Sequence, residues 1–289
     1  KILHEPGMKV ITLTDSDYPS RLKALKKPPE ALFVKGEMPE ENTPLVGIVG
    51  TRSASERGKE IAYDMAQKLS KEGIWVISGL ARGIDTAAHQ GAKGKTIAVL
   101  GSGFNKLYPK ENEKLSQEIT LFSEYAPDIP PARGQFPQRN RIVAALSDIL
   151  IVVEAPEKSG ALITAELAIH LDKKCFVIPG PFEKAHFRGS NRLIKEGKGE
   201  ICLDVEEIFS FFKKEQPVIN SKFTHSKTAH PEEFKILSLL EREDLSFDQL
   251  MLLTGYSASH LNVHLMSLVL NRLIKEYAGR VYGKIAYNS

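Results

Sequence analysis

The sequence predicts an α/β protein in which a parallel sheet is flanked by helices, followed by a small C-terminal winged-helix domain. Two patterns carry this prediction. Residues 45–92 follow the order strand, tight turn, helix, strand, tight turn, helix, which is a βαβ unit with parallel strands. After residue 230 apolar residues recur at helical spacing and then alternate, as in three helices and a hairpin.

Length and composition place limits on the function. A chain of 289 residues with 42% apolar residues suits one large and one small globular domain. It holds no apolar run of about 18 residues and begins without a hydrophobic targeting segment, so we expect no membrane span and a cytoplasmic location. Cys175 and Cys202 lie in apolar surroundings and are expected to be buried thiols. A net charge of +3 is too small to identify a partner.

The first 44 residues form a lead-in. Short apolar runs at residues 10–13 and 31–34 predict two strands. Because this stretch is too short to build a core of its own, we expect residues 1–44 to pack on the main sheet.

The main domain is expected at residues 45–212. Its first strand, residues 45–49, is apolar throughout, as in a strand buried on both faces. Helical spacing of Ala62, Met65 and Leu69 predicts the crossover helix, and Gly73 suits the left-handed position after it. Later strands are expected at residues 74–77, 96–100, 120–123, 149–153 and 175–178, and helices at 142–146 and 161–171.

A linker and a second domain follow. Residues 213–230 have no periodicity and mix Lys, Ser, Thr and Pro, which predicts a linker. The winged-helix domain is expected at residues 231–289, with helices beginning at Pro231, at residue 246 and at residue 257, the third ending near Ile274. The third helix has few arginines, so we expect this domain to contact protein more than duplex DNA.

Two loops of the βαβ unit predict a phosphate site. They leave the carboxyl ends of parallel strands, where open α/β sheets bind ligands, and each enters a helix N-terminus, which favours anions. Small residues let backbone N–H groups approach a ligand, and each loop carries one arginine. The candidate residues are Gly50, Thr51, Arg52 and Ser53 in the first loop, and Gly79, Arg82 and Gly83 in the second.

A basic run before residue 142 extends the candidate site. Arg133, Arg139 and Arg141 surround Phe136, and arginines neutralise phosphates while an exposed aromatic ring stacks on unpaired bases. The competing interpretation is that Phe136 is core and that the arginines, like Arg52 and Arg82, form ion pairs. Further on, Ser159, Gly160 and Thr164 can offer hydroxyl and N–H groups to phosphate, although helix capping is their commoner use.

The sequence argues against catalysis and cofactors. Residues 91–96, GAKGKT, lack the leading glycine of a P-loop and precede their strand. There is no G-x-G-x-x-G, HExxH, paired CxxC or GxSxG pattern. The carboxylates near the loops, Asp85, Glu124, Glu154 and Glu166, are not paired by spacing, and His89 is expected to be packed. We therefore expect no catalytic residue, no metal and no cofactor.

Several ordered motifs resemble the DNA-processing protein A (DprA/Smf) family. They are GTRSASERG at 50–58, SGLARGIDTAAHQGA at 78–92, TIAVLGSGFNKLYP at 96–109, SEY at 123–125, FPQRNR at 136–141, SGALITAELA at 159–168 and VIPGP at 177–181. Together they cover about residues 36–210.

The resemblance implies a fold and a role. The fold is an extended Rossmann-like domain that binds single-stranded DNA without sequence preference and forms homodimers. Family members protect incoming DNA in natural transformation and load a RecA-type recombinase. Carried over by motif, the phosphate contacts are Gly50, Arg52, Arg139, Asn140, Arg141, Ser159 and Gly160, with Phe136 near the bases.

Two other functions stay open from the residues alone. The first is an enzyme or sensor that binds a free nucleotide or sugar phosphate in the same pocket. The second is a regulator that binds duplex DNA through residues 231–289.

Overall fold

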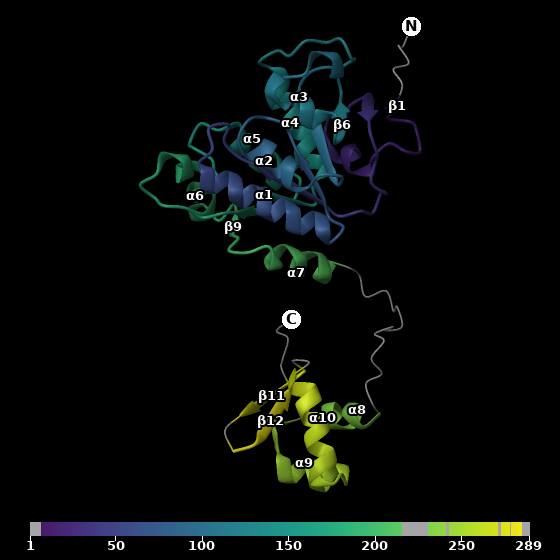
Figure 1. Ribbon diagram of the computed structural model, residues 1–289, viewed down its shortest axis with the longest axis vertical. Coiled ribbons are helices and arrows are strands. Elements are labelled where there is room, and N and C mark those ends of the chain that lie inside the picture. Colours follow the sequence, from purple (N-terminus) through teal and green to yellow (C-terminus); the bar gives the residue numbers. More distant parts are fainter. Residues whose placement is uncertain (1–6, 216–230, 241–242, 271–272, 278, 285–289) are drawn as a thin grey trace. The chain divides into compact units, whose positions relative to one another are not determined.

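The computed structural model describes residues 7–215, 231–240, 243–270, 273–277 and 279–284. The chain divides into two compact units, Lys1–Pro217 and Val218–Ser289 (Figure 1).

The first unit is built on one nine-stranded sheet with the order β1-β2-β6-β5-β4-β3-β7-β8-β9. From β6 to β9 in this order all neighbours run parallel, whereas β2 is antiparallel to both β6 and β1. The strands are β1 (Met8–Thr12), β2 (Ala31–Lys35), β3 (Leu45–Val49), β4 (Trp75–Ser78), β5 (Thr96–Leu100), β6 (Thr120–Ser123), β7 (Ile149–Val152), β8 (Lys174–Val177) and β9 (Glu200–Ile201). The predicted strands are confirmed. Most of their ends agree with the prediction within one residue, although β1 begins two residues earlier than expected. Strand β9 is an additional short edge strand.

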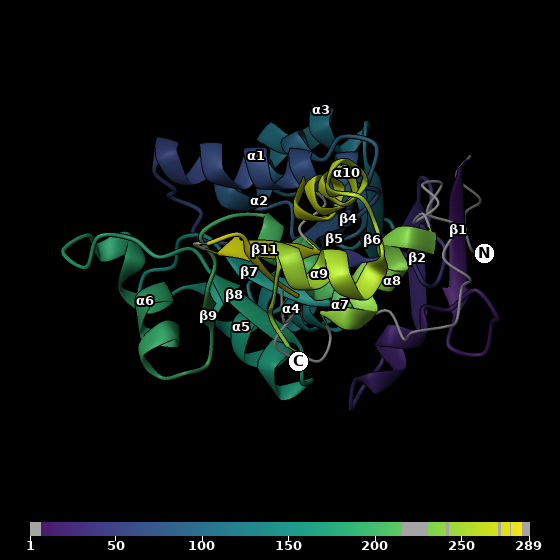
Figure 2. The same ribbon diagram turned by 90° about the horizontal axis from the view of Figure 1, so that it is seen from below.

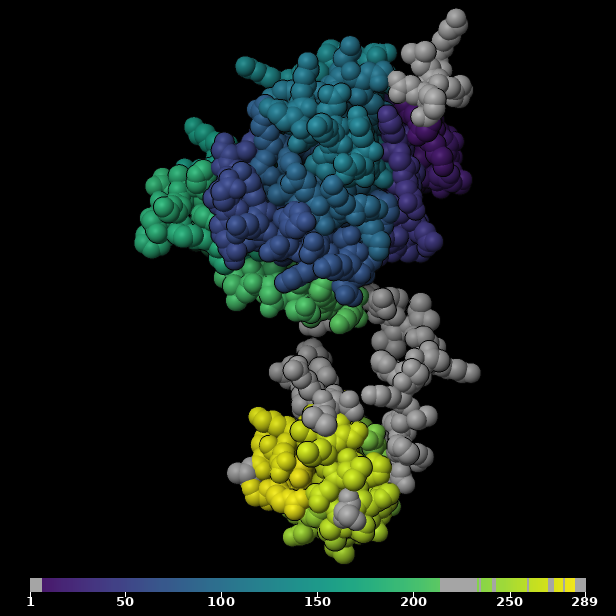
Figure 3. All heavy atoms as spheres, in the orientation of Figure 1, coloured from purple at the N-terminus to yellow at the C-terminus, as the bar shows by residue number. Residues whose placement is uncertain are grey.

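Helices cover both faces of this sheet (Figure 2). The helical segments are η1 (Ser20–Ala24), α1 (Glu56–Lys71), α2 (Ile84–Gly91), η2 (Phe104–Lys106), η3 (Lys110–Asn112), α3 (Glu113–Ser116), α4 (Gln135–Leu146), α5 (Gly160–His170), η4 (Ala185–Phe187), α6 (Arg188–Lys195) and α7 (Glu206–Glu215). Helices α4 and α5 pack on one face, and α1, α2 and α7 pack on the other. The blue atoms of α1 and α2 accordingly lie on the face of this unit that Figure 3 shows.

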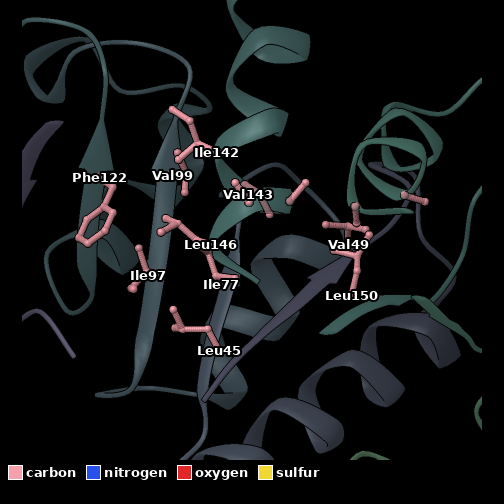
Figure 4. Packing of buried hydrophobic residues seen from close by; sticks show 14 of the residues in the cluster. Leu45, Val49, Ile77, Ile97, Val99, Phe122, Ile142, Val143, Leu146 and Leu150 are labelled. Carbon is pink, nitrogen blue, oxygen red and sulfur yellow. The ribbon is translucent and has the colours of Figure 1, made fainter. Parts of the chain in front are cut away.

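Alternation along the strands builds two cores. Leu45 and Val49 of β3 point to the α4 side and belong to the same buried cluster as Ile142 and Leu146 of α4, which Figure 4 draws. Ile48, between them, packs with α1 and α2 on the other face. Because successive strand side chains point to opposite faces, a strand buried on both sides must be apolar throughout, which the sequence of β3 satisfies.

The crossover helix α1 forms as predicted. Ser55 caps it by accepting a hydrogen bond from the Gly58 N–H at 3.0 Å. The Met65 and Leu69 side chains are buried, and Gly73 takes a φ of 81°, the left-handed conformation expected after the helix.

A polar contact joins the lead-in to the main sheet. The Arg21 guanidinium donates to both carboxylate oxygens of Asp148, at 2.9 Å each. The same carboxylate accepts the Leu45 N–H at 2.8 Å, so it also fixes the start of β3.

The second unit contains three helices and a small sheet. The elements are α8 (Pro231–Leu239), β10 (Leu245–Ser246), α9 (Phe247–Thr254), α10 (Ala258–Leu270), β11 (Ile274–Tyr277) and β12 (Val281–Lys284), with the strand order β10-β12-β11. The three helices and the hairpin match the expected elements, and the winged-helix assignment itself stays a prediction.

Two expected boundaries are wrong. Helix α10 ends at Leu270 and not near Ile274, because Ile274 pairs with Lys284 in the hairpin. Helix α7 continues to Glu215, so residues 213–215 are helical and not linker. The rest of the expected linker, residues 216–230, lies outside the described residues. Across the described ranges, no helix combines the length and apolarity needed to cross a bilayer.

We expect Asp148→Ala to destabilise the first unit by about 2–3 kcal/mol, because it leaves the half-buried Arg21 without its anion. Urea unfolding followed by fluorescence of Trp75, the only tryptophan, measures this unit alone. Asp64→Ala, at an exposed position on α1, is the matched control and should change the free energy of unfolding by less than about 0.5 kcal/mol. Equal effects of the two substitutions would contradict the anchoring role.

His89 predicts a pH dependence of stability. Its ring is fully buried on α2, and its Nδ1 lies 2.7 Å from the Thr96 Oγ1, which itself donates to the Val76 carbonyl. Burial, and then the Arg139 charge, lower the pKa of His89 to about 3. The unfolded ring titrates near pH 6.5, so below this pH the unfolded state binds more protons and stability falls.

Between pH 7 and pH 5 we expect the free energy of unfolding to drop by about 2 kcal/mol from this group. His89→Gln should flatten the dependence measured by Trp75 fluorescence, whereas His186→Gln, at an exposed position, should not. An unchanged slope in His89→Gln would show that another group is responsible.

Candidate nucleic-acid interface

The candidate site lies where the order of strands reverses. Successive strands from β3 to β6 are added on one side of β3, whereas β7 to β9 are added on the other. The loops after β3 and β7 therefore diverge and leave a crevice at the carboxyl edge of the sheet, the usual ligand position in such folds. A cavity of about 350 Å³ occupies this place and is lined by both loops, by the loop after β4 and by α4.

Glu154 holds the two diverging loops together. Its backbone carbonyl accepts the Thr51 N–H at 2.7 Å, and its buried carboxylate accepts the Ser55 N–H at 2.9 Å and the Ser55 hydroxyl. Helix α1 thus begins at a fixed position beside the cavity, with its N-terminus at the anion-favouring edge.

Arg139 forms a buried cationic floor of the cavity. Only 4% of this residue is exposed, and its Nη1 donates to the carbonyl oxygens of Gly79, at 2.6 Å, and Val99. A Cβ at position 79 would lie 2.4 Å from the guanidinium, so a side chain there would displace Arg139 from this position. Burial lowers the pKa of Arg139 to about 10, which leaves it positive at neutral pH. The Nη2 atom makes no hydrogen bond to the described residues, so it can donate into the cavity.

Asp85 shapes the loop after β4. Its carboxylate accepts the N–H groups of Gly79 at 3.1 Å and Ala81 at 3.4 Å. Burial raises the pKa of Asp85, and the Arg139 charge opposes this rise.

Arg52 and two aromatic rings form a platform beside this floor. The Arg52 guanidinium lies 5.5 Å from the centre of the Phe136 ring, and the Tyr108 ring centre lies 5.6 Å from that of Phe136. Arg52 is exposed and makes no ion pair within the described ranges, so the expected alternative of a glutamate partner is not observed. A second cavity of about 510 Å³, the aromatic cavity, is lined by this platform and shares Arg52, Arg139, Asn140 and Gly160 with the first.

Arg82 and Arg141 form ion pairs, as the competing interpretation of the sequence expected. Arg82 pairs with Glu111 at 2.5 Å, although it also lines a small hollow between the platform residues. Arg141 pairs with Glu124, both largely buried, and lines none of the cavities at the rim.

Phe136, Arg139 and Arg141 of the basic run lie within a helix and not before it, which corrects the expected start at residue 142, whereas Arg133 lies in the turn before the helix. Helix α4 begins at Gln135, because Pro137 falls in the first turn, where its missing N–H costs no hydrogen bond. Arg139 and Arg141 are then about 200° apart around the helix, so they face different sides.

The remaining candidates have local roles. Ser159 caps α5 by accepting the Ala161 N–H at 3.2 Å, and the Asn140 amide and the Thr164 hydroxyl both donate to the Gly160 carbonyl. Gly83 has a φ of 80° and lets the loop after β3 approach closely, since a Cβ there would lie 2.4 Å from the Thr51 carbonyl oxygen. Ser53 is exposed and lines none of the cavities.

The structure thus brings most of the sequence candidates together. The nine that line the first cavity are Gly50, Thr51, Arg52, Gly79, Arg139, Asn140, Ser159, Gly160 and Thr164. Sequence reasoning missed Lys158 and Tyr108, which line the first and the aromatic cavity. The position of Lys158 directly before Ser159 in a loop at the same edge was the available signal.

Comparison with known proteins shows the family of the chain. The family model for DNA recombination-mediator protein A matches residues 9–213. The DNA processing protein DprA of Bacillus subtilis is 37% identical over 228 residues, which are 76% of this chain and 75% of that protein.

Two solved structures have a similar fold. DNA processing protein A of Helicobacter pylori, described as having a unique single-stranded DNA binding mode, is 33% identical, with a TM-score of 0.66 over 71% of this chain and 96% of that chain. DprA of Streptococcus pneumoniae is 35% identical, with a TM-score of 0.66 over 71% of this chain and 74% of that chain. The chain therefore belongs to the DNA recombination-mediator protein A family.

Proposed function

We propose that the carboxyl edge of the sheet in the first unit, where the two cavities lie, binds single-stranded DNA. It contacts the phosphates and stacks aromatic rings on the bases, without reading the sequence. The observation that carries this proposal is the continuity of the two cavities, which places a phosphate-type site beside an aromatic platform. The cation Arg52 belongs to both. The single-stranded DNA binding described for the Helicobacter pylori relative supports it.

A polymer suits this site better than a free nucleotide does. Cavities of about 350 and 510 Å³ joined through shared residues exceed what one mononucleotide would fill, and Pro131 and Arg133 also line the aromatic cavity. The groups offered are guanidinium, backbone and aromatic-face groups. Phosphate contacts carry no base information, and every base has a face that stacks.

The wider role follows from the family. We propose that the chain protects incoming DNA in natural transformation and recombination, transfers it to a RecA-type recombinase, acts without catalysis and works in the cytoplasm. We also propose that it does so as a homodimer formed through the Rossmann-like domain. Crosslinking of the purified chain, alone and with a RecA-type recombinase, tests the two protein contacts.

We expect Arg52→Ala to weaken binding of oligothymidine, oligoadenine and oligocytosine by the same factor, about ten- to a hundredfold. Loss of one phosphate contact should also lower the salt slope of log K by about 0.7. Fluorescence anisotropy across a salt series measures both. Arg192→Ala removes an arginine already paired with Glu196 and is the control. If Arg52→Ala binds like the wild type, the phosphate site is elsewhere.

Phe136→Ala should weaken binding through lost stacking, by about 1–3 kcal/mol per base, and leave the salt slope unchanged. Phe136→Tyr keeps the ring and should bind nearly as the wild type does. The same anisotropy series separates this effect from that of Arg52. A changed salt slope in Phe136→Ala, with Trp75 fluorescence showing an intact fold, would mean that the ring supports cations and does not stack.

A further inference from the structure

A third cavity continues the cleft beyond the aromatic platform. It has a volume of about 570 Å³ and shares Tyr108 and Pro131 with the aromatic cavity. We call it the lysine groove, because Lys35, Lys106 and Lys110 line it. It runs from the carboxyl edge of the sheet past α3 toward the end of β2, where Lys35 stands opposite Leu121 of β6.

The charges of this groove are strongly unbalanced. All three lysines are exposed, and their ammonium groups make no ion pair or hydrogen bond within the described ranges. Glu113 is the only acid among the lining residues. Two exposed cations outside the groove, by contrast, are neutralised. Arg82 pairs with Glu111, and Lys93 pairs with Glu118. Three unpaired ammonium groups and one carboxylate in a concave channel leave an excess of positive charge, which attracts a polyanion.

We propose that the lysine groove holds the sugar–phosphate backbone of the same DNA strand after it leaves the aromatic platform. This inference rests on the proposed function and adds a second, purely electrostatic segment to the binding track. Lysine is a compact, hydrated point charge. Tyr108 lies where the groove meets the aromatic cavity, and the other aromatic residue of the groove, Phe104, is largely buried. Beyond Tyr108 the groove therefore contacts phosphates and does not stack bases. Only a strand long enough to pass Tyr108 reaches it.

The test compares short and long oligothymidines, of about 4 and about 16 nucleotides, the range that single-strand modules occupy. The variant is the full chain with Lys35→Gln, Lys106→Gln and Lys110→Gln combined. For the long oligonucleotide we expect the salt slope of log K to fall by about 2, since each lost phosphate contact removes about 0.7. That difference corresponds to a loss of up to about a hundredfold at 0.1 M salt. For the short oligonucleotide we expect affinity and slope to stay unchanged.

A matched variant controls for net charge. Lys68→Gln, Lys71→Gln and Lys173→Gln remove the same charge from the C-terminal end of α1 and from the turn between α5 and β8, near the amino edge of the sheet. They should leave binding of both oligonucleotides unaffected. Equal loss with the two triple variants would overturn the groove as a track, as would equal loss for both lengths. If the unmodified chain binds neither oligonucleotide, the proposed function itself fails. If it binds both and the groove variant changes nothing, only this inference fails.

Discussion

A guanidinium buried beneath the rim of the sheet is the contact on which the site depends. A charge removed from water is tolerated only where carbonyl and carboxylate groups replace the water. Arg139 finds them in the Gly79 and Val99 carbonyl oxygens at the ends of β4 and β5, and in the Asp85 charge nearby. The same contact orients α4. Phe136 lies one turn before Arg139 on the same side of the helix, so its ring is directed over Gly101 at the rim.

The order of the strands creates the cavity that Arg139 lines. The β3 and β7 strands are hydrogen-bonded neighbours, and their connection continues beyond the strands through the Val153 N–H to the Val49 carbonyl and the Thr51 N–H to the Glu154 carbonyl. After that the two loops separate toward α1 and α5, which lie on opposite faces of the sheet. The cavity is therefore a consequence of strand order, and the short side chains in its walls keep it open.

The sequence predicted what is local and missed what is distant. Apolar runs located the parallel strands, because burial on both faces leaves no other composition. The exposed loop arginine Arg52 and the capping role of Ser159 also followed from short-range pattern. By contrast, the carbonyl of Gly79 lies 60 positions before Arg139, and no periodicity reveals such a partner. The lysine groove is assembled from β2, η2 and η3, so its charges are scattered in the sequence and adjacent only in the fold.

Arginines of similar sequence setting therefore have different roles, and the difference is set by the carboxylate within reach. Arg82 meets Glu111 and Arg141 meets Glu124, so each contributes little field at the rim. Arg52 and the groove lysines make no ion pair among the described residues, and Arg139 is held by two backbone carbonyl oxygens and the nearby Asp85. The positive potential of the cleft thus comes from the cations that stay unpaired. A net charge of +3 for the whole chain does not reveal this local concentration of charge. Since released counterions scale with phosphates neutralised, these unpaired cations also determine how steeply salt weakens binding.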